Sequence, residues 1–179
     1  VEELSNCNHF HQSQIIKVLL YLATTEDNKK QPVLVSIRGD QEVNEIKLSN
    51  EISRQLEKNI LALTAIKHDD IKAQGISSIP FGFIGPDLSD SILSNAENWE
   101  KFFIRITDKS AKDLNSFICG NNKKDQHRIF INWDLINTKH LICDIRKAKP
   151  GDKCCHDQKQ ILKECKGIEI GHIFQLGTK

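Results

Sequence analysis

The first part of the chain is organised as apolar runs separated by polar connections. Residues 15–23 form a nearly continuous apolar run that is interrupted only by Lys17, and residues 32–37 form a second run. The polar segment 24–31 separates the two runs, and a turn at Gly39-Asp40 follows them. This pattern predicts two strands that are joined as a hairpin.

The next segment changes from strand-like runs to helical spacing. Ile52, Leu56 and Ile60 recur at intervals of four residues after Ser49, which is a candidate N-cap. They predict a helix of about three turns with one apolar stripe. Residues 61–66 predict a strand, and residues 69–74 predict a short helix that ends at Gly75.

Short apolar runs continue to the end of the chain. They predict strands at 102–106, 116–119, 128–133, 141–145 and 168–176, with a helical segment at 111–114. Residues 87–100 are polar, and the basic and polar stretch 146–163 is expected to be a surface loop or a crossover. Seven or eight strands with two or three helices predict a mixed α+β domain.

Composition narrows the class of protein. A length of 179 residues suits one compact domain or two at most. A net charge of +1 excludes a protein that coats nucleic acid or membrane by bulk charge, although a local basic patch is compatible with it. No apolar run approaches the roughly 18 residues of a membrane span, so no membrane partner is expected.

Two residue counts bear on origin and compartment. The chain contains no methionine, so it has either lost its initiator or been cut from a longer protein, and its ends favour excision. Its six cysteines include no Cys-x-x-Cys pair, which favours reduced thiols in a cytoplasmic compartment. Cys154, Cys155 and Cys165 lie near His156, but vicinal cysteines do not match zinc-ligand spacing. Free thiols are therefore expected, and no metal is assigned.

The sequence lacks the signatures of an activated serine, a two-histidine zinc site and a phosphate-binding loop. Lys17 is the first unusual residue, since it lies within an apolar strand. It is either an outward-facing lysine on a half-exposed sheet or a cationic anchor at the mouth of a pocket.

A glycine-rich segment is the second candidate. Gly82-Phe83-Ile84-Gly85-Pro86 is either an ordinary turn or a loop whose backbone N–H groups converge on an anion or a developing oxyanion. His127 lies beside Lys123, Lys124 and Arg128. This cluster is either a solvated basic turn or a contact for a phosphate backbone.

These features occur together in a recognisable order. They comprise Lys17, RGDQEVNEIK at 38–47, Gly-x-x-x-Pro at 82–86, Asp108, His127, INWD at 131–134, Asp144-Ile-Arg146, Gly151-Asp152 and GIEIGHIFQLGTK at 167–179. In this order the chain resembles the YbaK-like editing domain inserted in bacterial-type prolyl-tRNA synthetases. The resemblance implies an α+β fold with a mixed, partly barrel-like sheet and flanking helices.

The resemblance also implies an activity. The family hydrolyses the ester of alanine that has been mischarged onto tRNA(Pro), and water is the nucleophile. Lys17 matches the lysine that contacts the acylated 3′ end, and the 82–86 loop matches the loop that positions the ester. His127 and Asp108 match residues of the alanine pocket. Phe83 departs from the family pattern, in which a small residue often follows the first glycine, and its ring either narrows the pocket or turns outward.

The resemblance divides the chain into an editing domain at 1–166 and a return strand of the synthetase core at 167–179. Glu169, His172 and Gln175 are then remnants of that core. The editing reaction needs no cofactor, whereas the parent ligase uses ATP and magnesium. The expected partners are the tRNA(Pro) acceptor end and the rest of a cytoplasmic parent chain, which would be a homodimer.

Two alternatives stay open at this point. In the first alternative, the domain is a binding module for the acceptor end of the tRNA and no longer hydrolyses the ester. In the second, it is a free-standing deacylase for another acyl group.

Overall fold

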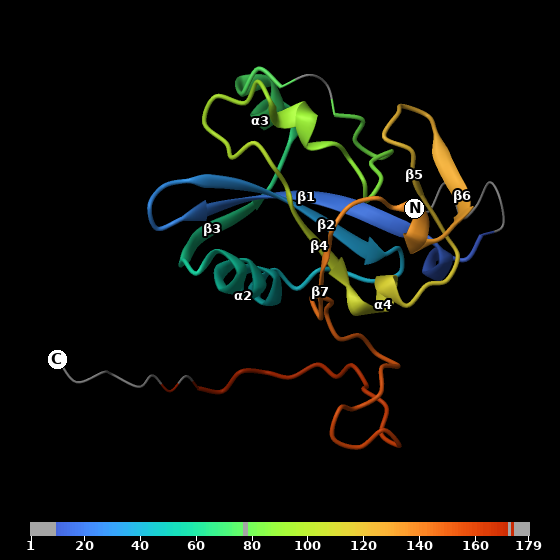
Figure 1. Ribbon diagram of the computed structural model, residues 1–179. Coiled ribbons are helices and arrows are strands. Elements are labelled where there is room, and N and C mark those ends of the chain that lie inside the picture. The colour runs from blue at the N-terminus through green and yellow to red at the C-terminus, as the bar shows by residue number, and fades with distance from the viewer. Residues whose placement is uncertain (1–9, 77–78, 172, 174–179) are drawn as a thin grey trace. The chain divides into compact units, whose positions relative to one another are not determined.

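The computed structural model describes residues 10–76, 79–171 and 173 (Figure 1). The chain divides into two compact units, Val1–Lys147 and Ala148–Lys179. The predicted boundary at residue 166 rests on the resemblance and stays a prediction. The first unit contains every named helix and strand of the described residues.

A long hairpin forms the centre of the first unit. Strands β1 (Ile16–Thr25) and β2 (Lys30–Arg38) pair antiparallel, in register from Ile16 opposite Arg38 to Thr24 opposite Lys30. This confirms the predicted hairpin. β2 is buried along nearly its whole length, so elements pack on both of its faces.

Further strands extend the hairpin into a mixed sheet. β3 (Ile60–Ala65) pairs antiparallel with β1, while β4 (Ile104–Asp108) lies parallel to β2 and β7 (Leu141–Cys143) lies parallel to β4. The order is β3-β1-β2-β4-β7. The predicted mixed α+β class is confirmed.

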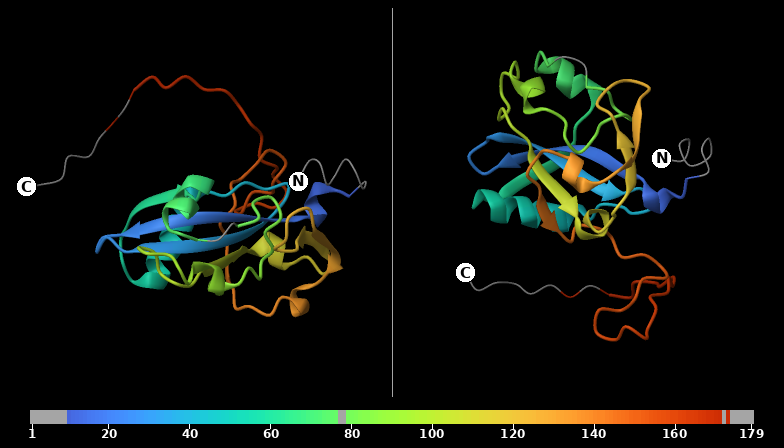
Figure 2. Two further views of the ribbon diagram at one scale, coloured as in Figure 1. Left: turned by 90° about the horizontal axis from the view of Figure 1, so that it is seen from above. Right: turned by 45° about the vertical axis from the view of Figure 1, so that its right-hand side comes forward.

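A second, two-stranded sheet consists of β5 (Phe117–Gly120) and β6 (His127–Ile131), which pair antiparallel (Figure 2). A bridge between Ile15 and Ile118 joins β5 to the residue that precedes β1. The pairing of β5 with β6 shifts its register before Phe117 meets Ile131, and Phe130 has a φ of 53° at this irregularity. Through this bridge, the hairpin of β5 and β6 is held beside the start of β1.

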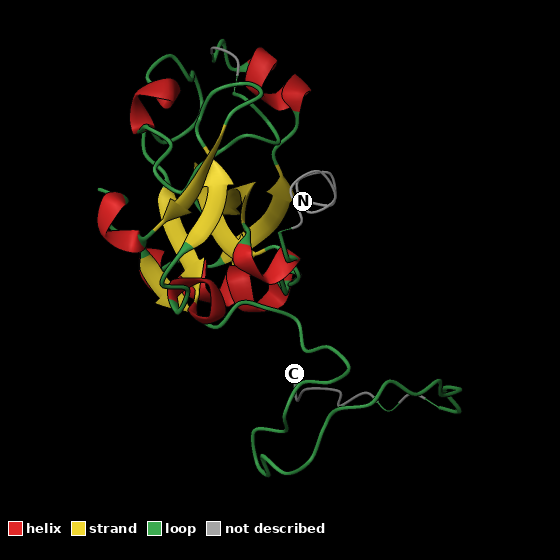
Figure 3. Ribbon diagram, turned by 90° about the vertical axis from the view of Figure 1, so that its right-hand side faces the viewer, coloured by secondary structure: helices red, strands yellow, loops and turns green. Residues whose placement is uncertain are grey.

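Helices lie on both sides of the strands (Figure 3). The α-helices are α2 (Glu45–Leu56), α3 (His68–Ala73) and α4 (Lys109–Lys112), and the 3-10 helices are η1 (Gln12–Gln14), η2 (Asp90–Leu93) and η3 (Trp133–Leu135). α2 covers one face of the central sheet, and α3 and η2 cover the other (Figure 1).

Alternating residues of the β1–β2 hairpin contribute to two hydrophobic cores, one on each face of the central sheet. Leu20 and Leu34 pack with Ile71, Leu93 and neighbours under α3 and η2. Their immediate neighbours Tyr21, Val33 and Val35 pack with Leu48 and Ile52 of α2. Successive side chains of a strand point to opposite faces, so one hairpin supports both layers.

The bounds of α2 differ from the sequence prediction. The predicted N-cap Ser49 lies inside the helix, and the true N-cap is Asn44, whose side chain accepts hydrogen bonds from the backbone N–H groups of Ile46 and Lys47. The helix ends at Leu56 because Glu57 takes a left-handed conformation with a φ of 54°. Ile60 therefore belongs to β3 rather than to the helical stripe.

The second unit contains little regular structure. An antiparallel bridge joins Lys153 to Ile161, and the Leu162 N–H donates to the carbonyl of Asp152 at 2.8 Å. A strand is predicted at 168–176, but its described residues, 168–171 and 173, form no strand. A strand needs a ladder of backbone hydrogen bonds to a neighbouring strand, and residues 168–171 and 173 take no strand assignment.

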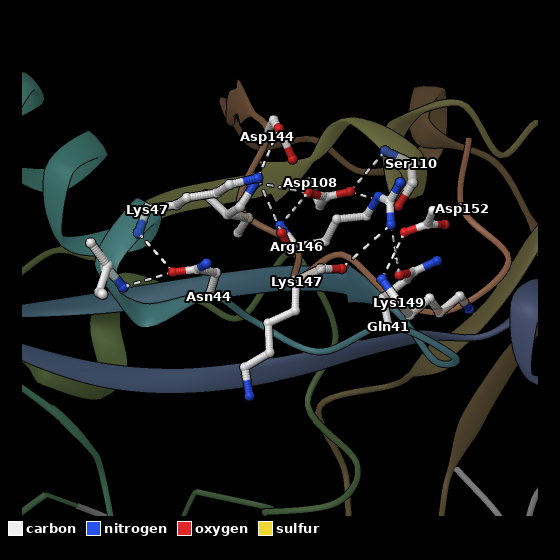
Figure 4. Close-up of polar contacts among 12 residues, drawn as sticks. Gln41, Asn44, Lys47, Asp108, Ser110, Asp144, Arg146, Lys147, Lys149 and Asp152 are labelled. Atoms are coloured by element: carbon white, nitrogen blue, oxygen red, sulfur yellow. Dashed lines mark hydrogen bonds and ion pairs between the residues drawn. The ribbon is translucent and has the colours of Figure 1, made fainter. Parts of the chain in front are cut away.

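Asp108 ties the end of β4 to the segment that follows β7 (Figure 4). One carboxylate oxygen caps α4 by accepting from the backbone and hydroxyl of Ser110 at 2.9 and 2.6 Å. The other accepts from the N–H groups of Ile145 and Arg146 at 2.9 and 3.1 Å. Lys47 of α2 reaches the same segment, since its Nζ donates to Asp144 and to the Arg146 carbonyl.

His140 forms a second polar link in this part of the fold. Its two ring nitrogens lie 2.8 Å from the hydroxyls of Thr107 and Thr138, and its ring meets Trp133 edge-on. Burial lowers the pKa of His140 to about 4, and the cations of Arg105 and Lys112 add to the shift. The neutral ring thus fits between two hydroxyl groups.

No helix within the described residues is long and apolar enough to cross a membrane.

We expect Asp108→Ala to destabilise the first unit. The change removes a helix cap, which is worth about 1 kcal/mol, and leaves buried N–H groups without their acceptor, which costs about 1–3 kcal/mol. Urea unfolding monitored by circular dichroism should show a loss of about 3 kcal/mol in the free energy of unfolding. A wild-type midpoint in the variant would contradict the structural role of Asp108.

We expect the free energy of unfolding to rise as the pH increases from about 4 to 6.5. The pKa of His140 is lowered to about 4 in the folded chain from an ordinary value of 6.5, so the unfolded chain binds the extra proton in this interval. The stabilisation is present above the unfolded pKa and is lost as the pH falls. Comparing urea midpoints at pH 4.5 and 7 for wild type and His140→Gln isolates this contribution, because the variant should show a smaller difference.

Candidate functional site

The first unit contains a cleft with a volume of about 370 Å³. Its wall is formed by the start of β1, the end of β3, the loop before η2 and the hairpin of β5 and β6. The lining residues are Ile15, Ile16, Lys17, Val18, Leu19, Leu20, Tyr21, Ala65, Ile66, Phe81, Gly82, Ile84, Gly120 and His127. This volume is typical of pockets that bind small ligands.

Lys17 interrupts an otherwise apolar stretch of the wall. Its Nζ donates a hydrogen bond to the carbonyl of Gly39 at 3.2 Å, so the head group is held near the turn after β2. Burial lowers the pKa of Lys17, and the carboxylates of Glu42 and Asp40 oppose this shift. The side chain is therefore a partly desolvated cation whose charge two nearby acids favour.

The loop at 82–86 meets the β5–β6 hairpin at very short range. Gly82 has a φ of 87°, a conformation that side chains disfavour. Gly85 is a glycine for a different reason, because a Cβ there would collide with Arg128 and with the Gly120 carbonyl. A Cβ on Gly120 would collide with the backbone of Phe83 and Ile84. The loop and β5 thus touch backbone to backbone.

His127 faces this loop from the start of β6. The ring centroids of Phe83 and His127 lie 5.2 Å apart, and the planes are tilted by 57°. Burial lowers the pKa of His127, and a hydrogen bond to the Gly82 backbone partly offsets the shift. The ring is consequently neutral at pH 7 and held between the loop and the cleft.

The cleft offers positioning and charge rather than a side-chain nucleophile. Cys119 is the residue before Gly120, but its thiol is fully buried, and burial raises its pKa to about 11. Within residues 10–76, 79–171 and 173, no group of three or more His, Cys, Asp or Glu side chains is placed to hold a metal ion. A cation, a neutral imidazole and a tight glycine loop are the groups available for chemistry.

The structure brings some of the predicted residues together and separates others. Lys17, Gly82 and His127 line the cleft. Phe83 packs against His127 and does not belong to the lining. Gly85 and Pro86 are buried.

Asp108 lies outside the lining and is almost fully buried, with an exposed fraction of 1%. Both of its carboxylate oxygens accept hydrogen bonds from the fold itself. The structure therefore places it at the end of β4, where it supports the fold, and not among the lining residues of the cleft.

The predicted basic cluster separates into two kinds of residue. Lys123 and Lys124 are exposed in the turn between β5 and β6, where they are accessible to a phosphate. Arg128 instead forms a two-pronged ion pair with Asp87, with distances of 2.8 and 2.6 Å.

The predicted core remnants belong to the second unit. Glu169 is exposed there, and His172 and Gln175 lie outside the described residues. Cys154, Cys155 and Cys165 carry free thiols in the same unit.

Sequence reasoning missed several residues that shape the site. Tyr21 and Phe81 line the cleft, and the Gly39 carbonyl receives Lys17. Asp87 and Asn122 secure the loop through side-chain hydrogen bonds. The sequence pointed to Asp87 and Asn122 only through their neighbours. Asp87 directly follows the Gly-x-x-x-Pro loop, and Asn122 lies in a polar turn.

Comparison with known proteins places these features in a family. The chain is 69% identical over all 179 residues to the proline–tRNA ligase of Prochlorococcus marinus strain NATL1A. It is 55% identical to the enzyme of strain MIT 9211 and 47% identical to that of Parasynechococcus marenigrum. In each case the match covers the whole chain, which spans 30% of the relative's length.

A solved structure supports the same fold. The crystal structure of a hypothetical protein superposes with a TM-score of 0.54 at 15% identity, covering 82% of this chain and 83% of the other. A family model described as the aminoacyl-tRNA editing domain matches residues 1–138, which include the whole cleft. The chain therefore belongs to the aminoacyl-tRNA editing domain family.

Proposed function

We propose that this chain is the editing domain of a proline–tRNA ligase and that it hydrolyses alanine from mischarged tRNA(Pro). One observation carries the proposal: Lys17, the Gly82 loop and His127 line a single cleft in a chain of the aminoacyl-tRNA editing family. The relatives that match the whole chain are named proline–tRNA ligase, and these names support the choice of parent enzyme and of tRNA(Pro) as the substrate.

The need for such a reaction follows from the size of the amino acids. Alanine is smaller than proline, so a proline pocket cannot exclude it sterically. Each missing methylene loses only about 1–3 kcal/mol of binding discrimination. A second site that accepts alanine and rejects proline removes the resulting error.

The proposed chemistry is ester hydrolysis by water. Water adds to the ester carbonyl, the bond between the acyl carbon and the ribose oxygen breaks, and a proton passes to the released 3′-terminal hydroxyl. Free alanine and intact tRNA(Pro) are the products. Lys17 would bind the acylated end as a fixed cation, and the 82–86 loop would position the ester, since positioning and fixed charge can supply most of the rate for an activated ester.

His127 would act as the size filter. Its ring contacts Phe83 and is hydrogen-bonded to the Gly82 backbone, and both contacts favour the position it takes beside the cleft. A neutral ring also avoids repelling the ammonium group of the aminoacyl ester.

The remaining parts of the proposal concern the parent protein. The chain spans 30% of the length of its relatives, so ATP, magnesium and proline would bind outside it. We place the parent in the cytoplasm as a homodimeric ligase that uses ATP. Lys123 and Lys124 are the proposed contacts for the tRNA, and the 167–179 segment would return to the ligase core.

We expect Lys17→Ala to reduce the release of alanine from Ala-tRNA(Pro) about a hundredfold or more, which is typical of losing one charge-stabilising group. The assay follows deacylation by the full-length ligase. Lys29→Ala is the matched control, because Lys29 is exposed and pairs only loosely with Glu100 at 3.9 Å. Near wild-type release by Lys17→Ala would remove Lys17 from the site.

We expect His127→Ala to loosen the size filter. The variant should hydrolyse Pro-tRNA(Pro), which the wild type rejects, with a gain of about tenfold, corresponding to one contact of about 1–3 kcal/mol. Measuring deacylation of alanyl and prolyl esters side by side checks this. Unchanged rejection of proline would exclude His127 as the filter.

The wild-type measurement also separates the alternatives. If the full-length ligase binds Ala-tRNA(Pro) and releases no alanine, the proposed hydrolysis is wrong and the domain is a binding module. Faster release of a different aminoacyl group would indicate another acyl specificity.

A further inference from the structure

Three polar side chains connect the 82–86 loop to the β5–β6 hairpin. Arg128 of β6 donates from Nη1 and Nη2 to the two carboxylate oxygens of Asp87, and Nη2 also donates to the Gly120 carbonyl at 3.2 Å. Asn122 donates from Nδ2 to Asp87 at 2.9 Å and accepts from the Gly85 N–H at 2.7 Å. We call Asp87, Asn122 and Arg128 the loop clamp.

Backbone contacts reinforce the loop clamp. The Asn122 N–H donates to the Phe83 carbonyl at 2.9 Å, and Asn122 takes a φ of 58° to make this contact. The absence of side chains at Gly85 and Gly120 lets the two segments meet without a gap. Any shift of the loop toward the hairpin is therefore blocked by backbone, and a shift away breaks the hydrogen bonds of the loop clamp.

The charges of the loop clamp are largely withdrawn from water. The side chains of Asp87 and Arg128 are each 23% exposed. Burial raises the pKa of Asp87, but hydrogen bonds from Arg128 and Asn122 outweigh it and leave the pKa below its ordinary value. A two-pronged arginine–carboxylate pair is also directional, so it fixes orientation as well as distance.

The loop clamp connects two segments that each form part of the cleft wall, the 82–86 loop and the β5–β6 hairpin. Gly82 and Ile84 belong to the loop, whereas Gly120 and His127 belong to the hairpin. Arg128 directly follows His127 in β6, and Asp87 directly follows Pro86. Each partner of the ion pair thus adjoins one wall in sequence.

We propose that Asp87, Asn122 and Arg128 are positioning residues that fix the separation between the Gly82 loop and His127 and thereby set which acyl groups the cleft accepts. Arg128 accordingly acts within the protein rather than on a tRNA phosphate. The acyl-selectivity part rests on the proposed function, whereas the fixed position of the loop does not.

The test compares two aspartates of the same segment in the full-length ligase. Asp87→Ala breaks the loop clamp. Asp90→Ala is the matched control, because Asp90 also accepts two hydrogen bonds from an arginine, Arg105, at 3.3 and 2.7 Å, but lies outside the cleft. Thermal unfolding establishes how far each change destabilises the fold.

A third variant guards against unfolding of Asp87→Ala. Asn122→Gly removes only the side chain, and glycine accepts the φ of 58° without strain. It leaves the ion pair of Asp87 and Arg128 in place while releasing the Gly85 N–H.

Two readouts are measured for each variant. Hydrogen–deuterium exchange of the peptide that contains residues 82–86 reports the loop without any substrate, and we expect exchange to accelerate at least tenfold in Asp87→Ala and Asn122→Gly. The ratio of kcat/KM for Ala-tRNA(Pro) to that for Pro-tRNA(Pro) should fall about tenfold in the same two variants. Asp90→Ala should change neither readout, even if it lowers the melting temperature.

The outcomes separate the two proposals. Wild-type exchange in folded Asp87→Ala and Asn122→Gly would overturn the loop clamp, whatever the enzyme hydrolyses. Accelerated exchange with an unchanged acyl ratio would overturn its role in selectivity. If wild type releases no alanine, the proposed function fails, and the exchange measurement alone then decides whether the loop clamp fixes the loop.

Discussion

The antiparallel pairing of β1 with β2 is the constraint on which the rest of the first unit depends. Nine residue pairs hold the two strands in one register, and both faces of β2 are buried. A slip by one residue would exchange the side chains that point to each face and misplace both cores at once. The same register decides that Lys17 reaches the carbonyl of Gly39.

The cleft is assembled from segments that this hairpin brings together. β1 and the residue before it supply one wall with residues 15–21, and Ala65 at the end of β3 and the following Ile66 also line the cleft. The β5–β6 hairpin is joined to the start of β1 by the bridge at Ile15. The glycine loop packs closely on β5 where it lines the cleft.

Sequence patterns predicted the features that are determined by residues close together in the chain. The β1–β2 hairpin and the mixed α+β class follow from apolar runs and turns, whereas Ser49 was wrongly predicted as the N-cap of α2, which begins after Asn44. Asn44 prevails because its side chain binds two N–H groups of the first turn. The contacts of Asp87 with Asn122 and Arg128 span 35 and 41 residues, and no local pattern reports such a distance. The structural role of Asp108 was hidden for the same reason, since its partners Ile145 and Arg146 lie far along the chain.

The burial of Cys119 has a consequence for side reactions. An aminoacyl ester is a reactive acyl donor, and a thiolate beside it would capture the amino acid as a thioester before water could react. Cys119 adjoins the cleft residue Gly120, yet its side chain is fully buried and its pKa is raised to about 11, so almost no thiolate exists at neutral pH. In the proposed reaction, the acyl group would therefore pass to water rather than to this thiol.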